Sequence, residues 1–445
     1  MIKKNFSITP YIVILLVIFQ SCKLQKPQNS ISTSPNIILI MADDLGYEGL
    51  SCYGNEVLKT PHIDRMAAEG LLFTDFHSNS SVCTPTRAAL LTGKYQQRVG
   101  MEGVIYVRGP TREVGLDSSE MTVARLLKAN GYATGIFGKW HLGYNPEYNP
   151  VYHGFDEFYG YLSGNVDYHS HYDNSGIYDW WHNLETIEEE GYVTDLITKH
   201  TIDFIKDHKD EPFFAYVPHE SPHVPFQGPN DPAYRFDDNK FTYYGPIEDR
   251  DRAYIDMVES MDKGVGEILE TLKDLNLEEN TLVLFISDNG AESFGHNGIL
   301  NGDKGSLLEG GHRVPAIAYW KGKIEPGLSD ETVMTFDWLP TFLGLNQTQI
   351  PSDQQLDGMD ISHHLLSGKP LPERKLFWKY KKEKTIRQNQ YKLWMNDTDT
   401  LLFDLEEDIG EKVDISLKHP EKCKKMTNDL EAWDVEMSNL SQKTK

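Results

Sequence analysis

The residues that decide the fold are "PNIILIMADDLG", positions 35–46, where an unbroken apolar run ends in two adjacent aspartates, Asp43 and Asp44. Such a run is typical of a strand that is buried on both faces of a parallel sheet. Three further segments repeat the arrangement: "YATGIFGKWH" (132–141), "PFFAYVPHESPH" (212–223) and "TLVLFISDNG" (281–290). In each of them, charged, amide or imidazole side chains follow the apolar run.

Segments with helical periodicity lie between these candidate strands, at residues 119–131, 193–208 and 250–275. Strands that alternate with helices predict an α/β fold, here a large mixed, mostly parallel sheet flanked by helices. In open α/β sheets, ligands bind in the crevice beyond the carboxyl ends of the strands. The four strand ends should therefore deliver their polar side chains to one crevice.

The composition limits the classes of partner. The chain has 445 residues, 39% of them hydrophobic, and a formal net charge of -24. This is typical of a globular protein, and the strongly acidic balance argues against a nucleic-acid partner. If the substrate is an anion, positive charge must be concentrated in a pocket.

The first 22 residues have the layout of a secretory signal peptide, with two lysines, a short apolar run and then Cys22. Cys22 resembles a bacterial lipoprotein cleavage site, so the predicted location is exported, either periplasmic or tethered to a membrane through lipid on Cys22. An uncleaved N-terminal anchor is the alternative. Residues 23–34 are polar and predict a linker.

Two folded parts are expected after the linker. Residues 35–365 are predicted to form the α/β domain, and residues 366–445 a smaller C-terminal α+β subdomain. In the second part, residues 375–415 contain short β-like runs around turns, and residues 419–437 have the pattern of a closing helix.

Acidic and amide side chains at two strand ends suggest a cation site: Asp43, Asp44, Asp288 and Asn289. Two carboxylates about 4 Å apart repel by roughly 4 kcal/mol at an effective dielectric constant near 20. A cluster of three therefore needs a cation or raised pKa values. Oxygen ligands suit Ca²⁺ or Mg²⁺. Taken singly, each of these motifs is more often a turn or a helix cap.

Basic side chains can supply the positive pocket: Arg87, Lys139, His141, His223 and Lys304. Arg87 can grip an oxyanion with two hydrogen bonds. Lys139 and His141 would point the same way if the chain stays extended after its strand. Any one of the five, taken alone, is more simply a surface lysine or a hydrogen-bonded histidine.

Besides Cys22, the chain has three cysteines: Cys52, Cys83 and Cys423. In an exported protein two of them could pair, which leaves one unpaired. The sequence does not decide which, if any, are bridged. An isolated Cys83 would need a chemical reason.

Several motifs together resemble the type I, formylglycine-dependent sulfatases, an arylsulfatase-like family of the alkaline phosphatase superfamily. "CTPTRAALLTGKY" (83–95) is similar to the first family signature, in which C-x-P-x-R opens a helix, and "GYATGIFGKWHLG" (131–143) is similar to the second. "MADDLG", "SDNGAE" and "GDKGSLLEGGHRVP" follow the family's order, and "LFDLEEDIGEKVDI" resembles its C-terminal stretch. In that stretch Ile409 stands where the family usually has proline.

The resemblance implies a specific chemistry at position 83. In that family the signature cysteine is converted to Cα-formylglycine by a dedicated modifying system before folding. One oxygen of the hydrated aldehyde attacks sulfur and the alcohol leaves. The second hydroxyl then loses its proton, which expels sulfate and restores the aldehyde. A serine or a thiol could attack, but could not release sulfate by that elimination.

The resemblance also implies residue roles within a catalytic domain at 35–365. A Ca²⁺ ion, with Mg²⁺ less favoured, would be held by Asp43, Asp44, Asp288, Asn289 and modified residue 83. Sulfate oxygens would be held by Lys139 and Lys304. His223 would be a general acid near the leaving oxygen, His141 would assist proton removal, and Arg87 would stabilise residue 83. His219 matches no family position and is kept as a candidate substrate contact.

The substrate is predicted to be a sulfated carbohydrate. Residues 159–183 and 235–246 are rich in aromatic residues and histidine, and such side chains stack on sugar rings at the rim of a cleft. Ordinary core and loop packing is an equally good explanation for many of them.

Three alternatives remain open from the sequence. A phosphate or phosphonate monoester hydrolase of the same superfamily would share the site. An inactive glycan-binding lipoprotein would keep only the cleft. A chain made without the modifying system would keep a thiol at position 83 and be nearly inert.

Overall fold

The computed structural model describes residue 1 and residues 34–441, except 238–242, 247, 293 and 351–353. The predicted signal peptide beyond Met1, the predicted lipid site at Cys22 and residues 23–33 of the linker lie outside the described residues. Among the residues described, no helix combines the length and the apolar character that a membrane span requires.

A ten-stranded mixed sheet forms the centre of the fold, with strand order β11-β2-β10-β9-β1-β8-β4-β5-β6-β7. The middle strands β9, β1, β8, β4 and β5 pair in parallel, whereas β10, β6 and β7 pair antiparallel to their neighbours. The strands of this sheet are β1 (Asn36–Ala42), β2 (Leu71–Phe73), β4 (Ala133–Lys139), β5 (Glu157–Tyr161), β6 (Trp181–His182), β7 (Glu185–Thr186), β8 (Phe213–Pro218), β9 (Thr281–Ser287), β10 (Ala316–Tyr319) and β11 (Gly327–Ser329). The predicted mixed, mostly parallel sheet is confirmed.

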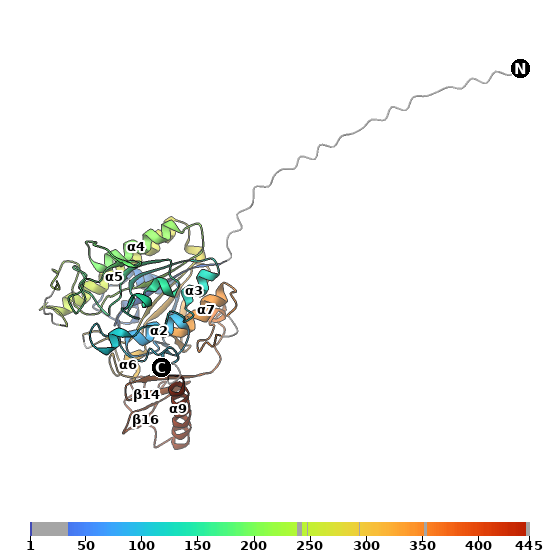
Figure 1. The fold of residues 1–445 in the computed structure, drawn as a ribbon. Coiled ribbons are helices and arrows are strands. Elements are labelled where there is room, and N and C mark those ends of the chain that lie inside the picture. Colours follow the sequence, from blue (N-terminus) through green and yellow to red (C-terminus); the bar gives the residue numbers. More distant parts are fainter. Residues whose placement is uncertain (2–33, 238–242, 247, 293, 351–353, 442–445) are drawn as a thin grey trace. The chain divides into compact units, whose positions relative to one another are not determined.

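Helices cover both faces of this sheet (Figure 1). Ile37 and Leu39 of β1 face a core shared with α2, α3 and α7, while Ile38 and Ile40 face a second core shared with α1, α4 and α5. The helices are α1 (Pro61–Glu69), α2 (Cys83–Thr92), α3 (Val123–Ala129), α4 (Val193–Asp207), α5 (Arg250–Asp274), α6 (Glu309–His312), α7 (Trp338–Leu345), α8 (Ser362–Ser367) and α9 (Pro420–Ser441). Because successive residues of a strand point to opposite faces, an uninterrupted apolar run is what a sheet covered on both sides requires.

The predicted helix at 119–131 is shorter than its apolar pattern suggests. The hydroxyl of Thr122 accepts a hydrogen bond from the backbone N–H of Arg125 at 3.2 Å and so caps α3, which begins at Val123. Threonine is a favoured N-cap residue because its oxygen satisfies a backbone donor of the first turn. The helices predicted at 193–208 and 250–275 are confirmed to within one residue.

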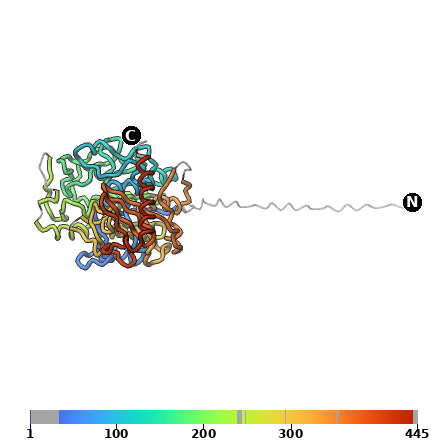
Figure 2. The backbone as a smooth tube through the Cα atoms, turned by 90° about the horizontal axis from the view of Figure 1, so that it is seen from below, coloured from blue at the N-terminus to red at the C-terminus, as the bar shows by residue number. Residues whose placement is uncertain are grey.

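The C-terminal residues form a second, smaller layer. Four antiparallel strands, β13 (Lys375–Tyr380), β14 (Glu383–Gln388), β15 (Tyr391–Met395) and β16 (Thr400–Asp404), pair in chain order, and α9 packs on them. In Figures 1 and 2 these residues, in red, gather below the large sheet as it is viewed in Figure 1. A separate two-stranded sheet pairs β3 (Phe76–His77) with β12 (Val333–Met334) in parallel. The predicted α+β character of this part is confirmed.

A buried network of charged side chains joins the C-terminal sheet to the α/β layer. Lys392 of β15 is fully buried, and its Nζ lies 2.9 Å from Glu309 Oε1 and 2.9 Å from Glu411 Oε1. The same ammonium lies 3.1 Å from Nε2 of His312. Glu309 and His312 are the first and last residues of α6, which closely follows the loop that contains Lys304. The C-terminal sheet therefore supplies the cation that compensates two buried carboxylates.

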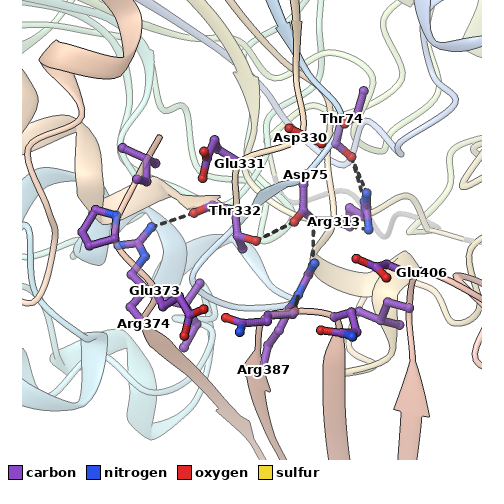
Figure 3. Close-up of a pocket in the computed structure, with 16 residues that line it drawn as sticks. Thr74, Asp75, Arg313, Asp330, Glu331, Thr332, Glu373, Arg374, Arg387 and Glu406 are labelled. Carbon is purple, nitrogen blue, oxygen red and sulfur yellow. Dashed lines mark hydrogen bonds and ion pairs between the residues drawn. The ribbon is translucent and has the colours of Figure 1, made fainter. Parts of the chain in front are cut away.

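Arg387 of β14 extends the network to Asp75. Arg387 Nη1 lies 2.6 Å from Asp75 Oδ1, and Arg313 Nη1 lies 3.3 Å from the same oxygen. Figure 3 shows Asp75 between these two arginines. Ligand-type atoms of His77, Glu309 and His312 lie within 4.8 Å of one another. Because the ammonium of Lys392 already contacts two of these residues, the cluster is a network of ion pairs and not a metal centre.

Replacing Lys392 by methionine is expected to lower the free energy of unfolding by about 3–5 kcal/mol, because the carboxylates of Glu309 and Glu411 would stay buried without their cation. The measurement is the shift of the urea denaturation midpoint. Lys382→Met is the matched control, since its ammonium forms an exposed ion pair with Asp397 at 2.6 Å and such pairs contribute about 0–1 kcal/mol. Equal midpoint shifts in the two variants would contradict the compensating role of Lys392.

Candidate active site

The site lies where the carboxyl ends of four adjacent strands meet, as predicted. The strands β9, β1, β8 and β4 are neighbours in that order in the sheet. They end immediately before Asp288, Asp43 and His219 and at Lys139, respectively. Helix α2 brings Cys83, its first residue, to the same edge. Residues far apart in the chain are thus gathered by the strand order and by the start of α2.

Asp43 and Asp288 are paired with Lys139 and Arg87, and Arg87 contacts both carboxylates. Lys139 Nζ lies 2.5 Å from Asp43 Oδ2, and Arg87 donates to Asp288 Oδ2 from Nη2 at 2.7 Å and from Nε at 3.0 Å. Arg87 Nη2 also lies 3.7 Å from Asp43 Oδ1. All four side chains are fully buried. Arg87 therefore fixes the carboxylate of Asp288 from α2 and ties this helix to β9.

Asp44 is paired from the other side of the site. Lys304 Nζ lies 2.6 Å from Asp44 Oδ2, and His223 Nε2 lies 3.6 Å from the same oxygen. Asn289 Nδ2 donates to Asp44 Oδ1 at 2.7 Å. Burial alone would raise the pKa of Asp44, but Lys304 and His223 outweigh it and lower that pKa to about 2. Asp44 is thus held as a carboxylate.

The residues present fit a bound divalent cation. Asp43 Oδ1 and Asn289 Oδ1 are buried and accept no hydrogen bond from any described residue. Burial, together with the negative charge of Asp288, raises the pKa of Asp43 well above its usual range in spite of Lys139 and Arg87. The existing cations therefore do not fully compensate this carboxylate. Oxygen donors that lack a partner beside uncompensated negative charge are the donor set that Ca²⁺ and Mg²⁺ prefer.

Cys83 stands beside this carboxylate cluster. Its Sγ and ligand oxygens of Asp43 and Asp288 all lie within 4.8 Å of one another. Burial raises the pKa of the Cys83 thiol despite Lys139 and Lys304. Only the thiolate is a strong nucleophile. An unmodified thiol at this position would therefore be poorly reactive near neutral pH.

The pKa values of His141 and His223 are both lowered in this environment. Burial, assisted by Lys139, lowers the pKa of His141 well below its usual range, and burial, assisted by Lys304, does the same for His223. His141 Nε2 hydrogen-bonds to the carbonyl oxygen of Ile105 at 2.8 Å. Its Nδ1 has no hydrogen-bond partner among the described residues. A neutral imidazole with one nitrogen left over can accept a proton.

One sequence-based expectation is wrong in detail, and another stays a prediction. His141 has a φ of 55°, so the chain leaves the extended conformation after Lys139, and the two side chains do not point the same way by strand alternation. His219 is fully buried and is not among the residues that line the cavity, so its role as a substrate contact stays a prediction. Its backbone N–H donates to the carbonyl of Met41 at 2.9 Å, just past the paired residues of β8 and β1.

A cavity of about 230 Å³ opens onto Cys83. Of the predicted site residues, Cys83, His141, His223 and Lys304 line it, whereas Asp43, Asp44, Asp288, Asn289, Lys139 and Arg87 lie buried behind them. The other lining residues are Val82, Val104, Ile105, Tyr106, Val107, Tyr144, Gly164, Asn165, Asn174, Tyr243, Gly305, Tyr380 and Lys381. The cavity has room for one small group above residue 83, with polar and aromatic walls around it.

The aromatic segments predicted to form the rim contribute only in part. Tyr243, 40% exposed, and Asn165 and Asn174 line the cavity, but Tyr168 and Trp180 are fully buried core residues. Some residues of these segments thus line the cavity, and others serve only as core packing.

Several lining residues were not predicted from the sequence. Tyr380 and Lys381 come from the C-terminal sheet, and Tyr106 and Val107 from a loop without regular structure. No sequence signal identifies Tyr380 and Lys381 as lining residues, because their segment "KYKK" has the pattern of an ordinary turn between two strands.

The cysteines do not pair within the described residues. Cys52, Cys83 and Cys423 are all free thiols. Cys83 is buried at the cavity, and the other two are half-buried elsewhere. The structure therefore has no disulfide among these three residues.

Comparison with known proteins gives consistent matches. A family model described as "Sulfatase" matches residues 35–348. An arylsulfatase from Hemicentrotus pulcherrimus is 34% identical over 385 residues, which cover 80% of this chain and 67% of that protein. N-acetylgalactosamine-6-sulfatase from Homo sapiens is 37% identical over 373 residues, covering 77% of this chain and 68% of that protein.

A solved structure agrees with the sequence matches. The crystal structure of Ps i-CgsB in complex with k-i-k-neocarrahexaose superposes with a TM-score of 0.81 at 32% identity, covering 90% of this chain and 92% of that chain. The match extends past residue 348, where the family model ends.

Proposed function

The chain belongs to the sulfatase family and is a sulfuric ester hydrolase, and we propose that it removes sulfate from a carbohydrate with a formylglycine at position 83 and a bound Ca²⁺ ion. The observation that carries the proposal is the juxtaposition at residue 83. Its side chain lies beside Asp43 and Asp288 at the floor of a cavity whose walls carry Lys304, His141 and His223.

Position 83 is suited to a residue other than cysteine. The burial that raises the pKa of the thiol makes it a weak nucleophile. A hydrated aldehyde there supplies two hydroxyl groups, one to displace the alcohol from sulfur and one whose deprotonation releases sulfate. Conversion of Cys83 requires a formylglycine-generating system acting before the chain folds, which is the first partner we propose.

Five residues would hold the metal: Asp43, Asp44, Asp288, Asn289 and residue 83. The ion would supply positive charge where sulfate oxygens and the nucleophilic oxygen carry negative charge. Ca²⁺ is favoured because the donor set consists of carboxylate and amide oxygens, and Mg²⁺ is the second choice.

Lys139 and Lys304 are proposed to bind sulfate oxygens. Each ammonium now donates to one aspartate, Lys139 to Asp43 and Lys304 to Asp44. An ammonium has three donors, so each lysine can keep its aspartate and still bind a substrate oxygen. Groups aimed at developing negative charge contribute about 2.7–4 kcal/mol each in comparable sites.

His223, His141 and Arg87 complete the proposed machinery. His223 lines the cavity next to Lys304 and is proposed to deliver a proton to the leaving alcohol oxygen. His141, with its unpartnered Nδ1, is proposed to take the proton when sulfate is released. Arg87 holds Asp288 and through it the floor under residue 83.

A carbohydrate sulfate is supported by the walls of the cavity. Tyr106, Tyr144, Tyr243 and Tyr380 supply aromatic surface, and Asn165 and Asn174 supply amide groups suited to hydroxyls. The human relative is named for a sulfated sugar, and the similar solved structure holds a neocarrahexaose. These neighbours support a glycan as the class of substrate without fixing the sugar.

The competing activity is phosphate or phosphonate monoester hydrolysis. Steady-state rates on methylumbelliferyl sulfate and methylumbelliferyl phosphate separate the two. We expect kcat/KM for the sulfate to exceed that for the phosphate by several orders of magnitude. Preference for the phosphate would overturn the assignment, and no turnover of either ester by protein modified at residue 83 would favour the inactive glycan-binding alternative.

Export is proposed from the first 22 residues, with a lipid on Cys22 as the membrane tether, in the periplasm or on a membrane facing it. Palmitate labelling of the full chain, compared with Cys22→Ala, tests the tether directly.

A further inference from the structure

We propose that the rim of the active-site cavity binds a second anionic group, a sulfate or a carboxylate on a sugar next to the one that is desulfated. The inference rests on the proposed function and narrows its substrate to multiply charged glycans. Three cations at the rim carry it: Lys381, Arg112 and Arg108.

Lys381 reaches the cavity from the C-terminal sheet. It occupies the turn between β13 and β14 with a φ of 52°, is exposed and lines the cavity. Its Nζ lies 4.9 Å from the ring centroid of Tyr380, which also lines the cavity. Among the residues that the structure describes, no carboxylate lies within ion-pair distance of Lys381. Its charge is thus available to a ligand.

Arg112 and Arg108 approach the rim from a different segment. The guanidinium of Arg112 lies 4.9 Å from the ring centroid of Tyr144, and its Nη1 donates to the carbonyl of Val107 at 3.0 Å. Tyr144 and Val107 both line the cavity. Arg108 Nη2 donates to the carbonyl of Ser175 at 3.3 Å, next to a lining asparagine. Within the described chain, neither arginine forms an ion pair with a carboxylate.

A second hollow of about 350 Å³ shows what a purely structural set of cations looks like. There Arg387 is paired with Asp75 at 2.6 Å (Figure 3). Arg374 donates to Asp337 at 2.7 Å. Arg313 in the same hollow also lies near Asp75, at 3.3 Å. These arginines compensate buried aspartates. Among the described residues, the cations of the active-site rim have no such carboxylates within ion-pair distance.

The acidic net charge of the whole molecule gives the rim cations a specific role in attracting an anionic substrate. A net charge of -24 repels a polyanionic glycan. Lys139 and Lys304 are already paired with Asp43 and Asp44, so they do not make the entrance of the cavity strongly positive. Unpaired cations around the mouth of an otherwise acidic protein steer anions toward that mouth and stabilise them there.

The test measures competition by a polyanion. Hydrolysis of methylumbelliferyl sulfate, which has one anionic group, gives KM, and low-mass dextran sulfate added as a competitor gives an inhibition constant. We expect Lys381→Gln and Arg112→Gln each to raise the ratio of inhibition constant to KM by about two- to fivefold at low salt, the size of an exposed ion pair. The double variant should raise it by about tenfold, and added salt should erase the difference.

Lys382→Gln is the matched control, because Lys382 is the next residue, is exposed and pairs with Asp397. It should leave the ratio unchanged, and uncharged dextran of the same length should not compete. The inference is overturned if Lys381→Gln and Arg112→Gln change the ratio no more than Lys382→Gln, or if dextran sulfate does not compete at all. Failure of the proposed function looks different: the unaltered enzyme would not turn over methylumbelliferyl sulfate in the first place.

Discussion

Replacing Cys83 by alanine is expected to reduce turnover of sulfate esters by at least about 10⁴-fold, since loss of a nucleophile removes the covalent route entirely. Cys83 is 2% exposed at the floor of the cavity and adjoins Asp43 and Asp288. The substitution deletes one sulfur atom, or the oxygens that replace it, so the fold should survive. Far-ultraviolet circular dichroism and the thermal midpoint check that it does.

Cys423→Ala is the control for Cys83→Ala, because Cys423 is a free, half-buried thiol that does not line the cavity. It should keep full activity. Mass spectrometry of the unaltered protein should find the peptide containing residue 83 about 18 Da lighter than its cysteine form, whereas the common cysteine oxidations add mass. Ordinary turnover by Cys83→Ala, or activity in a preparation whose residue 83 is entirely cysteine, would refute the proposed nucleophile.

Removal of divalent cations with a chelator is expected to lower kcat/KM by about 10²- to 10³-fold, the usual cost of losing a group that stabilises developing negative charge. The physical reason is that Asp43, Asp44 and Asp288 are gathered with only partial compensation, and the pKa of Asp43 is raised by its burial and by Asp288. Adding Ca²⁺ should restore activity more fully than adding Mg²⁺.

Thermal stability gives a second readout of the same site. Ca²⁺ at 100 times its dissociation constant should add about 2.7 kcal/mol to the stability of the unaltered protein. Asp43→Asn should lose most of this Ca²⁺-dependent gain, while Asp397→Asn, in an exposed ion pair, should retain it. A Ca²⁺-dependent gain in Asp43→Asn equal to that of the unaltered protein would show that the ion binds elsewhere.

The sheet could be predicted because its evidence is local. The apolar run of β1 ends at Asp43, and that of β9 ends at Asp288. Consecutive residues therefore indicate both that the strand is buried on two faces and that polar side chains follow it. That these ends meet at one edge follows because β9, β1, β8 and β4 pair in parallel. The start of α3 was the weaker prediction, because the hydroxyl of Thr122 stops the helix within an otherwise continuous pattern.

The site was predictable to the extent that its residues follow strands or belong to contiguous motifs. Asp44, Arg87 and Lys304 were placed in the site by their motifs, and the structure brings them together. His219 also follows a strand, but its side chain is fully buried and does not line the cavity, so its place there gives it no assigned role. Lys381 could not be found, since its position depends on how the C-terminal sheet packs and not on its neighbours in sequence.

The buried pairing of Lys392 with Glu309 and Glu411 has a consequence for recombination between relatives. A chimera that joins the α/β layer of one protein to the C-terminal sheet of another takes the two sides of this ion-pair network from different parents. Unless the donor sheet carries cations at the positions of Lys392 and Arg387, the buried carboxylates of Glu309 and Asp75 each lose a cation with which they pair. We therefore expect a stable chimera only when both layers carry complementary charges at these positions. Such an exchange of the C-terminal sheet would also replace Lys381 at the cavity rim.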